Sequence, residues 1–411
     1  MMNKPQPALP LTGALEFASA IEQAREIMLT APWYLFSATP QQEQALAERQ
    51  LKNQIAAALD KGFVLHDPLY PEFSVLDQHN QFGLVNPDNR YHLATIDADG
   101  TYEIRGKRGT SAYMVIQIGA GNPGVDVDLT SPIPVKELSG DDLILDDNGE
   151  FTITISEEKG DAKNWLPNHK DGLKANSILI RESFMDWQNE KSGTWYIERL
   201  DTRGQPSPIP TLDSVNDQYA LASEYLINST FGWVKFVDGL RANLAARQMS
   251  VPRETVNGLP GQWNAAGWFP MNPNIAYIIT VEKSNAQYQS IQLGDFWFNA
   301  QDFPQRHNSI TAEQAKVSRD GKLRFVISQQ DPGVANWLDP AGVPNVFAFM
   351  RWQGASAGDD FSQAPKVHIV PTADVQKIRE YFPDELFFSP EERAQQLAER
   401  RQACLTSPRG F

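Results

Sequence analysis

The 411-residue chain is predicted to be mainly β with accessory helices, and to fold into two tandem antiparallel β-sandwiches with jelly-roll-like connections. Two observations predict this class. Short runs of alternating apolar and polar residues follow one another from residue 85 onward, separated by Gly, Asn and Asp, which is typical of strands joined by turns. One stretch of such runs also occurs twice with matching spacing, which indicates a duplicated unit.

The repeat is clearest around an Asn-Trp-Leu sequence. "NGEFTITISEEKGDAKNWL" (148–166) aligns without a gap with "DGKLRFVISQQDPGVANWL" (320–338), and 16 residues separate Gly149 from Trp165 as they separate Gly321 from Trp337. A feature shared by both copies favours an architectural role. We expect each indole to close one end of its sandwich with its N–H on a backbone carbonyl, and each Asn to cap a turn.

The similarity continues more loosely on both sides of this block. Upstream, "NPDNRYHLATI" resembles "NPNIAYIITVE", which would make Tyr91 equivalent to Tyr277. Downstream, each copy ends in a strand that includes an arginine, Arg181 or Arg351.

Helical spacing of apolar residues predicts helices over 14–30 and 40–60. Thr39 and Gln42 suggest a capping box at the start of the second helix. A third helical stretch is expected over 214–249, interrupted near Gly232.

The last helix is expected to start at Ser389, with Pro390 in its first turn and Glu392 completing a capping box. Its high charge favours a solvated tail or an element that docks on a partner. The expected regions are a helical N-terminal region (1–84), a first β-sandwich (85–213), a helical and irregular connector (214–270), a second β-sandwich (271–370) and a helical C-terminal tail (371–411).

Composition excludes several classes of protein. The net charge of −15 argues against nucleic-acid and anionic-membrane partners, which need a basic surface. Cys404 is the single cysteine, so an intrachain disulfide and a cysteine zinc site are excluded. No apolar run reaches the length of a signal peptide or a spanning helix, and we expect a soluble, cytoplasmic protein.

Carboxylates present in one copy of the repeat are the candidates for acid–base chemistry. Asp331 and Asp339 bracket Trp337, whereas the first copy has Lys159 and Pro167 at these positions. The alternative is that both acids cap turns, since "DPG" and "DPAG" suit Asp as a turn initiator.

A second carboxylate pair, Glu182 and Asp186, is four residues apart in the first copy. On one strand both would share a face and could act as acid and base. The alternative for this pair is a solvated face.

The segment "GDFWFNAQDFPQRHNS" mixes aromatic and polar residues and contains Trp297, Arg306 and His307. Aromatic faces beside an arginine can hold a sugar ring or a flat apolar ligand, although alternate aromatics could instead fill the core. Three further candidates for ligand binding are Arg351, Arg90 and His92, the last two on one face of a strand.

No cofactor motif is present. The six histidines show no metal-binding spacing, and no dinucleotide, phosphate-loop or serine-hydrolase signature occurs. We therefore expect neither cofactor nor metal, with a nonlocal site of histidines and a carboxylate as the alternative.

Residues 270–400 resemble the bacterial domain-of-unknown-function family twelve-fourteen. The residues that carry the resemblance are Gly294, Asp295, Trp297, Asp331, Pro332, Gly333, Asn336, Trp337, Leu338, Asp339, Arg351 and Trp352. The resemblance implies a jelly-roll-like β fold, without an established activity or cofactor.

The leading hypothesis is an enzyme or enzyme-like protein that acts on a small sugar-like or amphipathic metabolite, as a metal-independent hydrolase or lyase. In this hypothesis Asp331 or Asp339 is the acid or base, and Arg306 or Arg351 is the charge clamp. The alternative is a non-catalytic module that binds a small ligand or assembles a homo-oligomer.

Overall fold

The computed structural model describes residues 11–126, 131–255, 261–356, 358–372, 374–382 and 386–406. Part of the expected connector and the first ten residues lie outside them. The helices are α1 (Thr12–Leu29), α2 (Pro32–Leu35), α3 (Pro40–Phe63), α4 (Leu212–Asn243), α5 (Val375–Arg379) and α6 (Pro390–Thr406).

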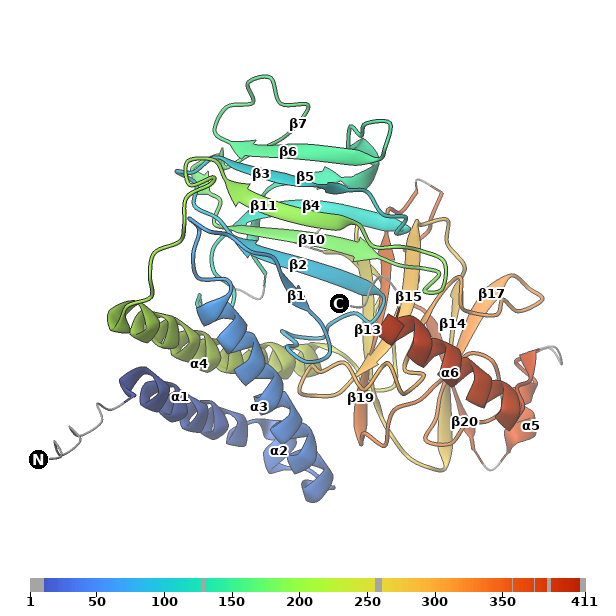
Figure 1. The fold of residues 1–411 in the computed structure, drawn as a ribbon. Coiled ribbons are helices and arrows are strands. Elements are labelled where there is room, and N and C mark those ends of the chain that lie inside the picture. Colours follow the sequence, from blue (N-terminus) through green and yellow to red (C-terminus); the bar gives the residue numbers. More distant parts are fainter. Residues whose placement is uncertain are drawn as a thin grey trace, which may run out of the picture.

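The strands form two β-sandwiches, which confirms the predicted class (Figure 1). The strands of the first are β1 (Ser74–Leu76), β2 (Asn89–Thr95), β3 (Tyr102–Lys107), β4 (Tyr113–Ala120), β5 (Ile133–Ser139), β6 (Glu150–Ser156), β7 (Asn164–Pro167), β10 (Ser177–Ser183) and β11 (Thr194–Arg199), beside a small hairpin of β8 (His169–Lys170) and β9 (Leu173–Lys174). Those of the second are β12 (Arg253–Glu254), β13 (Trp263–Pro270), β14 (Ile275–Glu282), β15 (Tyr288–Gly294), β16 (Ser309–Thr311), β17 (Lys322–Ile327), β18 (Trp337–Leu338), β19 (Asn345–Gln353) and β20 (Lys366–Pro371).

Each sandwich pairs a five-stranded sheet with a four-stranded sheet. The sheets of the first are β1-β2-β10-β4-β5 and β11-β3-β6-β7, and those of the second are β12-β13-β19-β15-β16 and β18-β17-β14-β20. In both, the strand that contains the repeated arginine, β10 or β19, lies at the centre of the five-stranded sheet. The duplication seen in the sequence is therefore a duplication of topology.

Two expected boundaries need correction because strands lie outside them. β1 precedes residue 85, and β13 lies inside the expected connector, where it pairs with β19 along its whole length. The sequence of β13, "WNAAGWFP", lacks alternation because both of its faces are covered. Phe269 faces the sandwich core, and Trp268 packs on the opposite face beside the helices.

The repeated Asn makes the same contacts in both copies. The Asn336 side chain accepts the backbone N–H of Lys316 (2.9 Å) and donates to the carbonyls of Lys316 (2.8 Å) and Arg324 (3.0 Å). Asn164 makes the same three bonds to backbone groups 20 and 12 residues upstream. One side chain thus joins the loop before β7 or β18 to the strand with which β7 or β18 pairs. This is a larger role than the expected turn cap.

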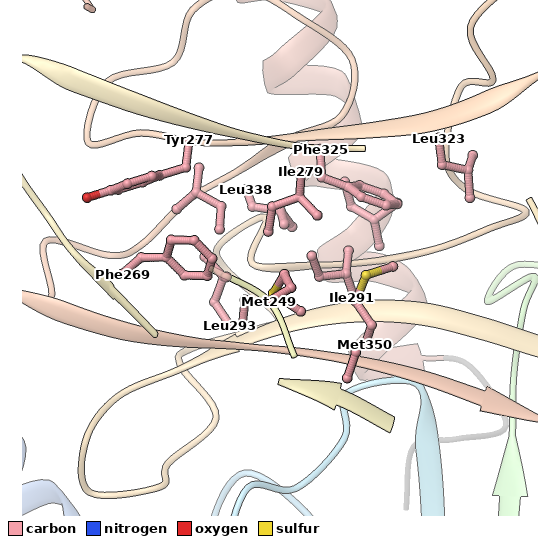
Figure 2. Close-up of a cluster of buried hydrophobic side chains, with 14 of the residues drawn as sticks. Met249, Phe269, Tyr277, Ile279, Ile291, Leu293, Leu323, Phe325, Leu338 and Met350 are labelled. Atoms are coloured by element: carbon pink, nitrogen blue, oxygen red, sulfur yellow. The ribbon is translucent and has the colours of Figure 1, made fainter. Parts of the chain in front are cut away.

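The tryptophan does not close the sandwich, and this expectation was wrong. Because neighbouring residues of a strand face opposite sides, Leu338 enters the core between the two sheets (Figure 2) while Trp337 lies on the outer face. Trp337 donates its N–H to the Ser328 carbonyl (3.0 Å), as expected, whereas Trp165 donates to the hydroxyl of Ser156 (3.2 Å). The surroundings also differ, since Trp337 is buried and Trp165 is half-buried.

The looser upstream alignment was also wrong. Tyr277 pairs with Ile327 in the four-stranded sheet, and the residue at this position of the first copy is Tyr102, which pairs with Ile155. Tyr91 lies instead in the five-stranded sheet. The shared Asn-Pro pair is a turn signal that precedes different strands in the two copies.

Three long helices form a separate layer beneath the first sandwich and beside the second (Figure 1). α4 packs against both α1 and α3, and small residues such as Ala24, Ala58 and Ala222 allow close approach. α4 is continuous through Gly232, contrary to the expected interruption. A glycine inside a helix costs only about 1 kcal/mol relative to alanine, which the packing of this helix outweighs.

The two expected capping boxes have different outcomes. At α6 the box is confirmed, because Ser389 Oγ accepts the Glu392 N–H (3.2 Å) and Glu392 accepts the Ser389 N–H (2.6 Å). At α3 neither bond forms, and Gln42 instead donates to the carbonyl of Gly342 in the second sandwich. No helix in the described part of the chain is long and apolar enough to cross a membrane.

We expect Asn336→Ala to lower the free energy of unfolding by about 3 kcal/mol, since it removes three hydrogen bonds and leaves buried backbone groups unpaired. Urea denaturation followed by tryptophan fluorescence measures the change. Asn285→Ala, at an exposed position, is the control and should change stability by less than about 0.5 kcal/mol. Equal stability of both variants would contradict the bridging role.

Candidate functional site

A cavity of about 440 Å³ lies between the two sandwiches and the helical layer. Its walls come from the outer faces of both five-stranded sheets and from α3 and α4. The apolar lining residues are Ala57, Leu65, Leu76, Phe82, Leu84, Val85, Leu93, Ala94, Leu179, Trp233, Phe298 and Phe349. This size and character are typical of a small-molecule site.

Two arginines in equivalent positions of the repeat line this cavity. Arg181 on β10 pairs with Val115 of β4, and Arg351 on β19 pairs with Ser290 of β15, the strand equivalent to β4. Because alternate residues of a strand point to opposite faces, both arginines leave the sandwich cores and face the space between the two copies. The duplication therefore brings two guanidinium groups to one cavity.

Neutral side chains hold the two arginines in place. Arg181 Nη1 donates to Gln262 Oε1 (2.9 Å), and the guanidinium lies 5.3 Å from the centre of the Tyr91 ring. Arg351 Nη1 donates to Gln292 Oε1 (2.6 Å), and its guanidinium lies 5.7 Å from the centre of the Phe349 ring.

A chain of amides joins the two sandwiches at this point. Gln262 also accepts a bond from Gln353 Nε2 (3.2 Å), and Gln353 Oε1 accepts one from Ser183 (2.6 Å). Within the residues that the structure describes, no carboxylate pairs with either Arg181 or Arg351.

The charge of the cavity is opposite to that of the whole chain. Its charged lining residues are Asp60, Lys61, Arg181 and Arg351, in a protein of net charge −15. The Asp60 carboxylate accepts bonds from Ser74 (2.5 Å) and Asn80 (2.6 Å). Among the described residues, neither arginine forms an ion pair with Asp60, and Glu137 is near enough to interact electrostatically with Arg181 without forming an ion pair with it.

One wall residue has an unusual backbone conformation. Phe298 has a φ of 60°, which side chains other than glycine rarely adopt. The buried carboxylate of Asp295 accepts the N–H groups of Trp297 (2.9 Å) and Asn299 (3.0 Å), and so stabilises the turn. The turn presents the Phe298 ring to the cavity, 5.4 Å from Phe349.

Of the residues proposed from the sequence for ligand binding or catalysis, the structure places Arg351 in this cavity. Arg90 lies at a small separate cavity beside Cys404. His92 lies on the face of β2 opposite to Tyr91, which lines the central cavity. Its Nε2 is 3.6 Å from the buried Glu182 carboxylate.

Glu182 is held as a buried anion rather than exposed to a ligand. Burial alone would raise the pKa of this carboxyl, but the nearby His92 and hydrogen bonds from Ser192 (2.5 Å) and Gly193 (2.7 Å) together lower it. Asp186 does not share a strand face with Glu182, because β10 ends at Ser183. Its side chain caps the following turn through the Gln188 N–H (3.0 Å).

Asp331 and Asp339 each cap a turn, as in the alternative interpretation of the sequence. Asp331 accepts the Gly333 N–H (2.9 Å) and forms an ion pair with the buried Arg393 of α6 (2.8 Å). Asp339 accepts the Ala341 N–H (2.7 Å) and pairs with Arg306 (2.8 Å). The two carboxylates and Arg306 are absent from the lining of the central cavity.

His307 is buried under α6 and accordingly lies away from the central cavity. Its Nδ1 donates to the Trp337 carbonyl (2.6 Å), and burial together with the charges of Arg400 and Arg393 lowers its pKa well below the usual range. α6 is therefore bound to its own chain, contrary to the expected solvated or partner-docking tail. Arg400 enters the same region, with its guanidinium 4.5 Å from the centre of the Trp187 ring.

Trp297 packs in the interface between the helices and the second sandwich, with its ring 5.2 Å from that of Trp33. Near it, the carboxyl group of Glu43 on α3 is buried. Burial, together with the nearby charge of Asp295, raises the pKa of Glu43 to about 7. Trp297 is thus buried, but between the helices and the second sandwich rather than in the sandwich core that the alternative expected.

The described part of the chain contains no group of three or more His, Cys, Asp or Glu side chains placed to hold a metal ion. Arg181 lines the central cavity but is not among the residues predicted from the sequence to bind a ligand. Its equivalence to Arg351 was the available signal.

Comparison with known proteins agrees with a duplicated β-sandwich protein that carries the motif block of an uncharacterised family. Residues 265–357 match the model of the protein family of unknown function DUF1214, as the resemblance implied. The match covers most of the second sandwich. No curated protein matches the sequence.

The solved structures that resemble this chain include two bacterial proteins. An uncharacterised protein from Burkholderia cenocepacia has 22% sequence identity and a TM-score of 0.77, with 88% of this chain and 97% of that chain covered. A protein from Vibrio parahaemolyticus has 13% identity and a TM-score of 0.42, with 79% and 99% covered. The first shows that the fold is shared.

We expect Glu43→Gln to stabilise the protein at pH 8 by about 3 kcal/mol at most, and to have little effect at pH 5. The folded state keeps the Glu43 proton up to a pKa of about 7, whereas the unfolded state loses it near 4.5. The contribution of Glu43 to stability therefore declines as the pH rises between these values, and glutamine removes that decline.

Urea denaturation of both proteins from pH 5 to pH 8 measures this difference. Glu48→Gln, at an exposed position of the same helix, is the matched control. A constant difference between Glu43→Gln and the parent protein over this range would contradict a protonated Glu43.

Proposed function

We propose that the protein binds a small amphipathic anion in the cavity between the two sandwiches. The carboxylate or phosphate group of the ligand would lie at Arg181 and Arg351, and its apolar body along the remaining wall. The observation that carries the proposal is the presence of two guanidinium groups in one partly apolar cavity, neither of them in an ion pair with a carboxylate in the described part of the chain.

The arginines favour an anion for a physical reason. A guanidinium stays charged at all physiological pH values and offers donors that match a carboxylate or phosphate. Removing such a charge from water is costly unless an opposite charge or hydrogen bonds compensate. Gln262 and Gln292 satisfy part of the donors, and a bound anion would supply the missing charge.

The rest of the lining favours an apolar body over a sugar. Apart from the arginines and the amide side chains beside them, much of the lining is aliphatic or aromatic, including Leu179, Phe298 and Trp233. A sugar ring needs many directional hydrogen bonds, whereas a hydrocarbon gains from removal of apolar surface from water, at about 25 cal/mol per Å².

Binding is better supported than hydrolysis or elimination. Asp331, Asp339, Glu182 and Asp186, the carboxylates expected to act as acid and base, are absent from the cavity lining and have hydrogen-bonding partners elsewhere. The geometry therefore favours the non-catalytic alternative, with a small molecule as the partner.

We expect dodecanoate to bind to the parent protein, and Arg181→Gln and Arg351→Gln each to weaken its binding by about 10-fold or more. Each substitution removes charge-assisted hydrogen bonds while leaving the apolar wall. Isothermal titration calorimetry measures the dissociation constants.

Two controls separate charge from general apolar affinity. Dodecan-1-ol has the same chain without the anion, and its binding should be insensitive to both substitutions. Arg25→Gln, on the exposed surface of α1, should leave dodecanoate binding unchanged. No binding of dodecanoate, or equal binding by the double Arg181→Gln, Arg351→Gln variant, would exclude the proposal.

A further inference from the structure

A lysine amine lines the same cavity. Lys61 lies in the last turn of α3, where its side chain is half-buried and contributes to the cavity wall. In the described part of the chain no hydrogen bond or ion pair engages its amino group. The adjacent carboxylate of Asp60 is engaged by Ser74 and Asn80.

The surroundings of Lys61 increase the fraction of neutral amine relative to an exposed lysine. Burial lowers the pKa of Lys61 below the usual range for lysine, because an apolar environment disfavours the charged ammonium form. A neutral lysine amine is a nucleophile, and desolvation in an apolar pocket is one way in which proteins activate it.

The end of α3 and the arginines are anchored at different positions along the cavity. The loop after α3 contacts the end of β2, where Thr95 donates to the Leu65 carbonyl (2.6 Å). Thr95 pairs with Ser177 at the start of β10, whereas Arg181 lies four residues further along this strand. Four residues of a strand span about 13 Å.

We propose that Lys61 captures the carbonyl group of an oxo acid as an imine, while Arg181 and Arg351 hold the carboxylate at the other part of the cavity. This inference rests on the proposed function, and it narrows the ligand class to apolar acids that carry an aldehyde or ketone distant from the carboxylate.

The covalent step needs no further reactant. The nitrogen lone pair of the neutral amine attacks the carbonyl carbon, and the carbonyl oxygen accepts a proton to give a carbinolamine. The nitrogen then loses its remaining proton as the hydroxyl leaves as water, and a carbon–nitrogen double bond forms. One water is released for each imine, and neither carbon nor nitrogen is oxidised or reduced by an external agent.

The test uses 12-oxododecanoate with the full-length protein at pH 7, and cyanoborohydride to reduce the imine to a stable secondary amine. Intact mass spectrometry follows the adduct, and peptide mapping locates it. We expect a single adduct on Lys61, formed at least 10-fold faster than on any exposed lysine.

Lys61→Arg should abolish the fast adduct, since the guanidinium is not a comparable nucleophile, and its fold is verified by urea denaturation. Lys283→Arg, at an exposed position, should leave the adduct unchanged. Labelling spread evenly over many lysines, or fast labelling of Lys61→Arg, would overturn the inference.

Dodecanoate separates the two proposals. If dodecanoate binds to the parent protein and Lys61 is not labelled, this inference fails and the proposed function stands. If dodecanoate does not bind while Lys61 is labelled by dodecanal, the anion-binding function fails, and so does the oxo acid as the ligand class.

Discussion

The three hydrogen bonds of one asparagine position an edge strand, β7 or β18, of the four-stranded sheet in each sandwich. Asn164 and Asn336 tie the loop that follows β6 or β17 to backbone groups 12 and 20 residues upstream, with the same atoms in both copies. Once the asparagine is fixed, strand alternation sends the next residue, tryptophan, outward and the following leucine into the core. The outward Trp337 then provides the surface on which Arg393 of α6 lies, 5.3 Å from the ring centre.

The fold was predictable from the sequence where it follows from the local alternation of apolar residues and from the internal repeat. The gap-free match between the two copies is reproduced in the parallel pairing of Thr154 with Trp165 and of Val326 with Trp337. Prediction failed where both faces of an element are covered, as for β13. It also failed for the two Asn-Pro pairs, because this turn motif precedes strands that are not equivalent in the two copies.

The repeat was less informative about the candidate site than about the fold. Positions shared by both copies were expected to be architectural, and single-copy acids to be functional. Instead Asp331 and Asp339 form ion pairs that hold α6 and a loop, while the shared Arg181 and Arg351 face the central cavity. A residue shared by both copies can contribute twice to one cavity when the sheet faces on which it lies pack against each other. The sequence alone does not show which sheet faces do so.

The meeting of equivalent faces has an evolutionary consequence. In a symmetric dimer of single sandwiches, both arginines beside the twofold axis would be encoded by the same codon. Any mutation of that codon or of its neighbours would then alter both halves of the pocket together. Fusion into one gene frees the halves to diverge, and they have: Tyr91 stands opposite Arg181, whereas Asn264 stands opposite Arg351. An asymmetric molecule, with unlike ends, fits such a pocket better than a symmetric one.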